Sequence, residues 1–292
     1  MTQFEMRNHT FVFFGEDSFS LAVLRSLLVE ESGLSALAVI ILAPVSTSGE
    51  QLVNYCRKNE IPVIQIASFK DEKVIKLFAA MEYDFILSAH FQRIIPRSIF
   101  GRAKLNALNL HPSLLPYYRG MSPQHWPIVN GDKKTGVTVH VMEEDVDVGR
   151  IIDQVVINLS EDIYIHQLQK EFLKVYPRIM RNSVNKCIDG YQGIEQEVIA
   201  SSYYGKISTH DRTIVNSDSL KTAYGKIRAF SVPYAGAIYG DIEILRANRM
   251  NHEEFTSLYQ TFGIGFCQLG DVSYLILNDG GLSHLKWRKN EN

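Results

Sequence analysis

The chain is poor in cysteine, and its few cysteines lack the spacing of a structural motif. It has three among 292 residues, Cys56, Cys187 and Cys267, an odd number spread along the sequence. Disulfide frameworks need even, recurring sets, and structural zinc sites need short Cys/His spacings. The sequence therefore predicts neither a disulfide frame nor a structural zinc site, and it favours a reducing cytoplasm.

Long apolar runs and a surplus of one charge are also missing. No stretch approaches the ~20 consecutive apolar residues of a membrane span, and the polar residues 1–10 do not resemble a secretory signal. We therefore expect no membrane partner. With 30 basic and 32 acidic residues the net charge is −2, which makes a nucleic-acid partner unexpected, although a local basic patch stays open.

A glycine-rich dinucleotide fingerprint is absent as well. The first apolar run, residues 10–14, ends in a single Gly15, whereas nicotinamide-binding turns need three glycines for close backbone approach. This excludes the usual nicotinamide site. The helix start that follows, with Glu16 and Ser18, could still face an anionic group of a substrate.

What the first half of the chain does have is an alternation of strand-like and helix-like segments. Apolar runs that predict strands alternate with amphipathic segments that predict helices, the first of them capped by Asp17 or Ser18. The strands are expected at 10–14, 37–42, 62–66, 84–87, 107–111, 136–142 and 151–159, and the helices at 18–28, 51–58, 70–81 and 163–188, the last interrupted or kinked near Pro177. Such alternation predicts an α/β fold with a doubly wound, mostly parallel sheet.

The second part of the chain has a different pattern. The length exceeds the usual size of one hydrophobic core. Residues 203–219 are polar and turn-rich, and short β-type runs follow at 237–245, 265–269 and 272–277, with a turn at 278–281. We therefore expect an N-terminal domain over residues 1–200, a linker over 201–219 and a small, mostly β (OB-like) domain over 220–292.

The stretch from Ala107 to Gly120 holds the first candidate site residues. If Ala107–His111 is a strand, its period of two residues sends Asn109 and His111 to the same face. Pro112 and Pro116 end the strand and leave both polar side chains at its exit edge. Open α/β sheets bind ligands at this edge.

Several motifs in one order resemble those of a known family. They are Asn109-x-His111 with the Pro-Ser-Leu-Leu-Pro after it, Tyr118-Arg-Gly120, Asn130-Gly-Asp132, Thr135-Gly-Val-Thr138 and Asp147-x-Gly149, with weaker matches at 12–15, 227–229 and 233–236. Together they resemble the N10-formyltetrahydrofolate-dependent formyltransferases, a family that acts on methionyl-tRNA, glycinamide ribonucleotide and sugar nucleotides.

The resemblance implies that Asn109, His111 and Asp147 form a catalytic trio. Formyl transfer to an amine develops charge on the formyl oxygen. Asn109 could stabilise that charge with its amide, and His111, held protonated by Asp147, could supply a second donor. The same pair could accept the amine proton. The alternatives are a structural histidine at a strand end and an aspartate that only braces its turn; His140, inside a strand-like segment, is either structural or functional.

The resemblance also implies N10-formyltetrahydrofolate as the formyl donor, with no metal. In the family, three segments form the pterin cleft. Here they correspond to Arg93, Ile94 and Ile95, to Ser113, Leu114, Leu115 and Pro116, and to Glu143, Glu144 and Asp145 up to Asp147. Backbone groups and apolar walls of this kind suit a small-molecule pocket. Each of these residues could instead belong to the core.

Two features favour a sugar nucleotide as the formyl acceptor. Residues 40–55 contain no Lys or Arg, whereas the tRNA-modifying relatives carry an inserted basic loop there. Residues 119–126 are similar to the R-G-x-[AS]-P-x-N-W pattern of amino-sugar formyltransferases, with departures at Met121 and His125. Candidate substrate contacts are Glu16, Ser18, Tyr117, Tyr118, Arg119 and Trp126; a guanidinium matches phosphate oxygens, but Arg119 could also be a solvated surface residue.

The sequence therefore predicts an enzyme that formylates the primary amine of a nucleotide-linked amino sugar. A dTDP-linked amino-dideoxyhexose destined for a surface polysaccharide is the expected substrate. The alternatives are methionyl-tRNA formylation and a noncatalytic folate- or nucleotide-binding module. A homodimer is left open.

Overall fold

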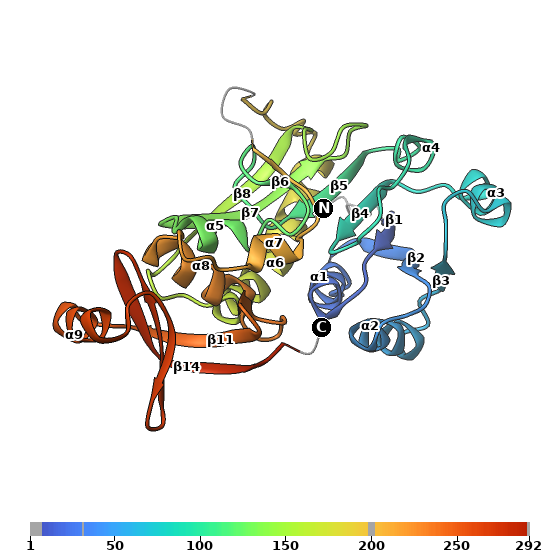
Figure 1. Cartoon of the computed structure of the whole chain (residues 1–292). Helices are drawn as coiled ribbons and strands as arrows, with labels where there is room; N and C mark the ends of the chain where they lie inside the picture. Colours follow the sequence, from blue (N-terminus) through green and yellow to red (C-terminus); the bar gives the residue numbers. More distant parts are fainter. Residues whose placement is uncertain (1–7, 31, 198–201, 291–292) are drawn as a thin grey trace. The chain divides into compact units, whose positions relative to one another are not determined.

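The computed structural model describes residues 8–30, 32–197 and 202–290, and the chain divides into two compact units. The first unit takes the described residues of Met1–Arg119, Gly136–Val156 and Phe172–Ser202. The second takes those of Gly120–Thr135, Ile157–Glu171 and Tyr203–Asn292. Figure 1 shows the chain from blue at the N-terminus to red at the C-terminus. The domain boundaries 1–200, 201–219 and 220–292 remain a prediction.

A seven-stranded sheet forms the frame of the first unit, in the order β3-β2-β1-β4-β5-β7-β8. The strands are β1 (His9–Phe14), β2 (Leu34–Leu42), β3 (Val63–Ile66), β4 (Phe85–Ala89), β5 (Asn106–His111), β7 (Lys134–Val141) and β8 (Ile151–Asn158). The pairings from β3 through β5 are parallel, and β5 pairs with β7 antiparallel. The predicted doubly wound, mostly parallel sheet is confirmed.

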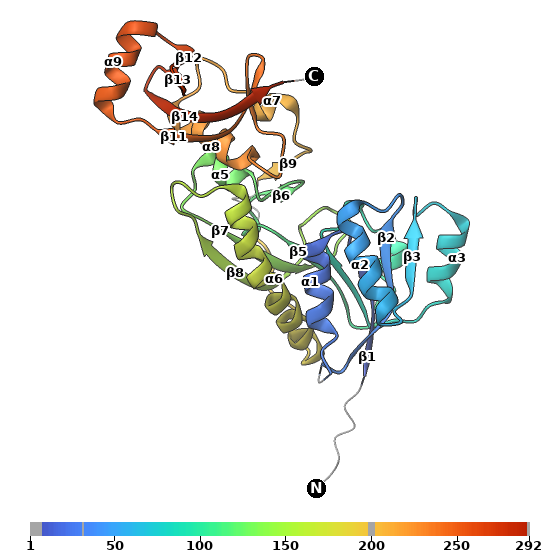
Figure 2. The same ribbon diagram turned by 90° about the horizontal axis from the view of Figure 1, so that it is seen from below.

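Helices cover both faces of this sheet. On one face lie α1 (Ser18–Leu27), α2 (Thr47–Lys58) and the first-unit part of α6 (Ile165–Ile188), and α1 is tied to α6 by a hydrogen bond from the Ser26 hydroxyl to the Pro177 carbonyl (Figure 2). On the other lie α3 (Glu72–Ala80) and α4 (Arg97–Phe100), where Phe78 and Ile99 join the core with Phe14. α6 is continuous through Pro177, so the helix is not interrupted there, and the alternative expectation of a kink remains a prediction.

Capping residues decide where the helices begin. The Asp17 carboxylate accepts hydrogen bonds from the backbone N–H groups of Phe19 and Ser20 and starts α1, as expected. Ser46 caps α2 in the same way, so that helix begins at Thr47 rather than at residue 51. Its first turn, Thr-Ser-Gly-Glu, is polar and therefore does not show in an apolar pattern.

The second unit holds a five-stranded antiparallel sheet in the order β10-β11-β14-β13-β12. Its strands are β10 (Ala237–Tyr239), β11 (Ile242–Arg249), β12 (Gly265–Leu269), β13 (Val272–Leu277) and β14 (Gly280–Lys289). The run expected at 237–245 is two strands because Gly240, with φ at 57°, makes a turn. The predicted turn at 278–281 is shorter, since β14 already begins at Gly280.

Helices of the second unit pack beside this sheet. They are α5 (Trp126–Asn130), α7 (Thr209–Arg212), α8 (Leu220–Phe230) and α9 (His252–Phe262), and none of the four was expected from the sequence. Ala223 and Ile227 of α8 share a buried core with Ile244 and Leu275. A two-stranded sheet joins β6 (Arg119–Gly120) to β9 (Tyr203–Tyr204). None of the helices among the described residues has the length and apolar character to cross a bilayer.

Candidate active site

The site is built on the end of β5 and on its neighbour β7. The antiparallel register of these strands places His140 opposite Asn109 and Thr138 opposite His111. The Nδ2 atom of Asn109 lies 3.2 Å from the Nε2 atom of His140. The polar side chains of the two strands therefore meet on one face, the face that the alternation of β5 predicts for Asn109 and His111.

Asp147 joins them from the loop between β7 and β8. Its Oδ2 atom is 3.4 Å from Nδ1 of His111, and its Oδ1 atom is 3.3 Å from Nε2 of His140. The three side chains are almost fully buried, with exposed fractions of 8% for Asp147, 5% for His111 and 3% for His140. The structure thus brings together all three residues of the expected trio and adds His140 between Asn109 and Asp147.

Backbone carbonyls decide which ring nitrogens carry protons. Nδ1 of His140 lies 2.8 Å from the carbonyl oxygen of Val141, and Nε2 of His111 lies 2.8 Å from that of Tyr118. A carbonyl only accepts, so both of these nitrogens must be N–H groups. In a neutral ring the other nitrogen then has a lone pair, which at His140 accepts the hydrogen bond from the Asn109 amide.

When both rings are neutral, the two Asp147 oxygens face Nδ1 of His111 and Nε2 of His140, and neither nitrogen carries a hydrogen. Each contact then joins two hydrogen-bond acceptors, which is unfavourable in a buried site. One additional proton relieves it. Because Asn109 already donates to Nε2 of His140, the edge between His111 and Asp147 is where that proton fits, and this pair is therefore able to take up and release a proton.

Burial lowers the pKa of His111 below its ordinary value of 6.5, while the charge of Asp147 and the hydrogen bond to the Tyr118 carbonyl raise it. The lowering by burial is the largest effect. The family resemblance implied a protonated His111 that donates to the formyl oxygen; the structure favours the neutral ring, whose Nε2–H already donates to the Tyr118 carbonyl. The geometry suits His111 better as part of a proton acceptor.

The turn that carries Asp147 has an unusual backbone. Asp147 has φ at 57°, in the left-handed region that few residues other than glycine adopt. A Cβ atom on Gly149 would overlap the carbonyl oxygen of Val141, so only glycine fits there. The Gln196 side chain, for which the sequence analysis gave no signal, donates to the carbonyl oxygens of Asp147 and Gly149 at 2.9 and 2.7 Å.

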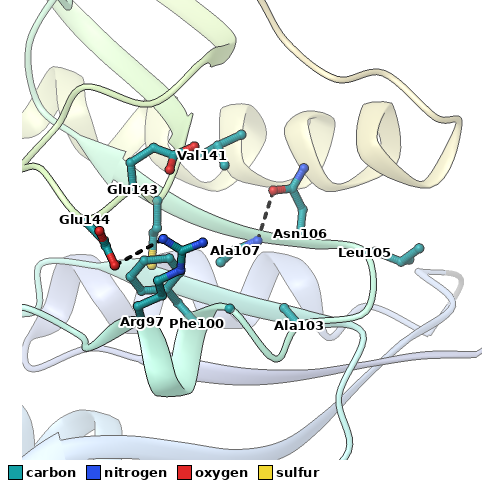
Figure 3. Close-up of a pocket in the computed structure, with 11 residues that line it drawn as sticks. Arg97, Phe100, Ala103, Leu105, Asn106, Ala107, Val141, Glu143 and Glu144 are labelled. Carbon is teal, nitrogen blue, oxygen red and sulfur yellow. Dashed lines mark hydrogen bonds and ion pairs between the residues drawn. The ribbon is translucent and has the colours of Figure 1, made fainter.

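A pocket of about 210 Å³ lies at the start of β5 (Figure 3), and Asn109, His111, His140 and Asp147 are not among the residues that line it. Its walls include Ala107, two positions before Asn109, together with Phe100, Met142 and Glu143. An ion pair between Arg97 and Glu144, 3.1 Å apart and well exposed, lies at this pocket. Glu143 and Glu144 were expected to bind the cofactor; Arg97, Phe100 and Met142 were not.

The other expected cofactor residues do not line this pocket. Ile95, Ser113 and Leu115 are buried at 7%, 0% and 3% exposure, and Leu114 and Pro116 are half-buried. Arg93, Ile94 and Asp145 are exposed, Ile94 by 73%. Their role in binding the formyl donor remains a prediction.

The expected substrate contacts are spread over both units. In the first unit, Glu16 accepts a hydrogen bond from the Gln92 backbone and burial raises the pKa of its carboxyl group, whereas Ser18 is exposed. Tyr117 is 48% exposed. Trp126 belongs to the second unit, where its ring stacks on Tyr204 at 4.5 Å.

Tyr118 and Arg119 are engaged within the first unit. Tyr118 has φ at 60° and offers its carbonyl oxygen to His111. Arg119 donates from Nη2 to Oε1 of Gln196 at 2.7 Å, so it is not simply a solvated surface residue. Among the residues that the structure describes, no group of three or more His, Cys, Asp or Glu side chains could hold a metal ion.

A family model described as formyl transferase matches residues 27–184, more than half of the chain. The protein therefore belongs to the formyl transferase family, an enzyme family, as the sequence motifs predict.

The chain is similar in sequence to two differently named kinds of protein. The chain is 34% identical over 190 residues to the bifunctional polymyxin resistance protein ArnA of Wigglesworthia glossinidia brevipalpis. The matched region covers 62% of this chain but only 28% of ArnA. It is 28% identical over 228 residues to a methionyl-tRNA formyltransferase of Staphylococcus epidermidis, with 75% and 72% of the two chains covered.

Two solved structures are similar over nearly their whole length. An N-formyltransferase from Helicobacter canadensis, in complex with folinic acid and dTDP-3-aminofucose, has a TM-score of 0.74 at 21% identity, covering 95% of this chain and 99% of its own. The sugar 3N-formyl transferase WlaRD, with dTDP and 5-N-formyl-THF, gives 0.75 at 21% identity, covering 98% and 99%. At this identity the likeness shows a shared fold.

Proposed function

We propose that the protein transfers the formyl group of N10-formyltetrahydrofolate to the primary amine of a nucleotide-linked amino sugar. The observation that carries this proposal is the contact of Asp147 with both His111 and His140, with Asn109 held by His140 at the same place. One amide donor and one proton-accepting pair thus lie together at the end of a strand. Acyl transfer to an amine requires these two groups.

Asn109 is the donor for the formyl oxygen. One of its N–H groups is fixed on Nε2 of His140, which leaves the other for an oxygen that gains negative charge as the amine adds to the formyl carbon. Such donors act where charge develops, and removal of one typically costs ~10²–10³ in kcat.

The His111–Asp147 pair manages the proton. An amine must be neutral to attack and must lose a proton once the new C–N bond has formed. The pair accepts that proton and returns one to the nitrogen of tetrahydrofolate as the old C–N bond breaks, so the charge balances over the reaction. The lowered pKa of His111 keeps it neutral and therefore able to accept.

The pocket beside β5 is the proposed position of the pterin ring. Phe100, Ala107 and Met142 offer apolar walls, and the Glu143–Glu144 segment offers polar groups at the rim. Folate compounds in both solved neighbours support a folate donor. The other expected cofactor segments, 93–95 and 113–116, are proposed as further walls of the cleft.

A sugar nucleotide is favoured over tRNA by the short connection after β2. Only residues 43–46 separate β2 from α2, and they contain no Lys or Arg. Binding of an acceptor stem needs cations to neutralise phosphates. The dTDP compounds in both solved neighbours support a dTDP-linked acceptor. Methionyl-tRNA is the rival acceptor, supported by the Staphylococcus relative.

The test is to incubate the purified protein with N10-formyltetrahydrofolate and a panel of dTDP-, UDP- and GDP-amino sugars beside methionyl-tRNA. Release of tetrahydrofolate and the gain of a formyl group by mass spectrometry identify the acceptor. We expect a dTDP-amino sugar to be formylated. Formylation of methionyl-tRNA alone would overturn the proposed acceptor. Binding of folate without formylation of any amine would support the noncatalytic module. The cytoplasmic location, the polysaccharide role and the homodimer remain predictions.

A further inference from the structure

Gln196 connects the catalytic turn to Arg119 through a complete set of hydrogen bonds. Its Nε2 donates to the carbonyl oxygens of Asp147 (2.9 Å) and Gly149 (2.7 Å), and its Oε1 accepts from Nη2 (2.7 Å) and Nε (3.3 Å) of Arg119. Gln196 is only 9% exposed. A primary amide has two donor hydrogens and one acceptor oxygen with two lone pairs, so this amide is fully satisfied.

We propose that Gln196 is a positioning residue that holds the Asp147 carboxylate at His111 and couples it to Arg119. The inference rests on the proposed function of Asp147. Gln196 does not touch the reacting atoms; it acts through the backbone of the turn that carries them. No residue of this segment was assigned a role by the sequence motifs.

The turn needs stabilising contacts from outside because its own backbone does not favour the observed conformation. We call the hydrogen bonds of the Gln196 side chain to Asp147, Gly149 and Arg119 the Gln196 clamp. Asp147 has φ at 57°, and such residues persist only where surrounding contacts impose them. The loop around Asp147 lies outside any helix or strand. The two N–H groups of Gln196 hold the carbonyl oxygens on both sides of Val148, and these bonds fix the rotation of the turn.

Arg119 fixes the orientation of the Gln196 amide. A guanidinium has only donors, so it requires Oε1 on its side and turns both N–H groups toward the turn. The segment that carries Gln196 is itself anchored, because Ile194 and Ile151 exchange two backbone hydrogen bonds of 2.8 and 2.9 Å. Gln196 is therefore held through its side chain by Arg119 and through its backbone segment by Ile151.

In the proposed reaction Arg119 would both bind an anionic group of the acceptor and, through Gln196, help to place Asp147. Arg119 follows directly after Tyr118, whose carbonyl oxygen accepts the hydrogen bond from His111. An anionic group of the acceptor that binds the guanidinium would meet a side chain already tied to the catalytic turn. Acceptor binding and the placement of Asp147 are then linked by one amide.

The test uses two variants that separate the hydrogen bonds of Gln196 to the turn carbonyls from its hydrogen bonds to Arg119. Gln196→Leu removes all four hydrogen bonds. Gln196→Glu keeps the size of the side chain and its bond to Arg119, but a carboxylate cannot donate to the two turn carbonyls. We expect both variants to lose about 10- to 100-fold in kcat, because a displaced catalytic group costs this much. The KM for the formyl donor should change far less.

A second readout separates positioning from general stability. If the Asp147 carboxylate moves away, its charge no longer raises the pKa of His111, so the acid limb of the pH–rate profile should shift to lower pH. Gln192→Glu is the matched control. It makes the same charge change four residues earlier, at an exposed amide that donates to the Gly190 carbonyl, and should keep wild-type kcat and profile.

The outcomes are distinct. Wild-type kcat in Gln196→Glu would overturn the proposal, because the carbonyl bonds would then be dispensable. An unshifted profile in both variants would also overturn it. If Gln196→Leu does not fold, Gln196→Glu alone decides. Absence of formyl transfer by the wild-type protein would instead contradict the proposed function; in that case the clamp is judged by the amide exchange rates of residues 147–149, which should rise in Gln196→Glu.

Discussion

The amide of Asn109 and the imidazole of His140 are joined by a 3.2 Å hydrogen bond between neighbouring antiparallel strands. Because Nδ1 of His140 is fixed as a donor to the Val141 carbonyl, its Nε2 is an acceptor and the Asn109 amide has one orientation only. In the proposed reaction, that orientation offers an N–H group, rather than a carbonyl, to the formyl oxygen. His140 would then belong to the functional arrangement by fixing the amide.

This relationship predicts a double-mutant cycle. Asn109→Ala should lower kcat by ~10²–10³ through loss of the donor, and His140→Met should lower it by a smaller factor, because the amide is then free to turn. The loss in the double variant should be smaller than the product of the two single losses, since His140 acts in part through Asn109 and also contacts Asp147. Asn59→Ala, at the end of α2, is the control and should be unaffected. Losses that simply add would contradict the account.

The catalytic turn should not tolerate a side chain at Gly149. A Cβ there would overlap the Val141 carbonyl oxygen, so the turn must move, and such overpacking typically costs about 1–3 kcal/mol. Gly149→Ala should therefore lower both the free energy of unfolding and kcat. Gly205→Ala, where a Cβ meets no atom within 4 Å, is the control for chemical denaturation and activity. If Gly149→Ala and Gly205→Ala had the same free energy of unfolding and the same kcat, the result would contradict this role of Gly149.

The pKa of His111 makes a prediction about the pH dependence of the reaction. The proposed base is the neutral ring, and burial lowers its pKa below 6.5. Activity should thus persist as the pH falls through 6.5 and decline only below it, at the lowered pKa. The measurement is kcat/KM against pH, which reports groups of the free enzyme. An acid limb above 6.5, assigned to His111 by its loss in a His111 variant, would count against this assignment.

His125 predicts a pH dependence of stability that is separate from catalysis. Burial lowers its pKa from 6.5 to about 4, and its Nδ1 donates to the Ala229 carbonyl. The unfolded chain binds the proton first, so stability is full above pH 6.5 and falls as the pH drops toward 4, by about 3 kcal/mol in all. Urea unfolding at several pH values measures this. His125→Asn, which does not titrate, should flatten the dependence.

The sequence pattern predicts the sheet and, of the site residues, the placement of Asn109 and His111. It predicts these features because they depend on residues that are near one another in the sequence. Alternation along β5 is a local signal, and it correctly places Asn109 and His111 on one face. The contact of Asp147 with His111 joins residues far apart in the chain, so only the family resemblance suggested it. His140 requires knowledge of the β5–β7 register, which sequence periodicity does not contain.

Other features were hidden by weak local signals. The clamp by Gln196 uses a side chain and two backbone carbonyls, and such contacts leave no periodic pattern. The start of α2 is polar, and the turn at Gly240 interrupts what looks like one β-type run. The helices α8 and α9 were missed beside the strands of the second unit.

The most direct measurement of the central claim is single-turnover formyl transfer by Asp147→Asn with the amino sugar that the wild-type protein accepts. The variant keeps the size of the side chain but removes the carboxylate from the His111–Asp147 pair that accepts the amine proton. We predict a loss of ~10²–10⁴ in rate, as for removal of a general base, with N10-formyltetrahydrofolate still bound and Asp189→Asn, an exposed control, unaffected. A wild-type rate in Asp147→Asn would contradict the account.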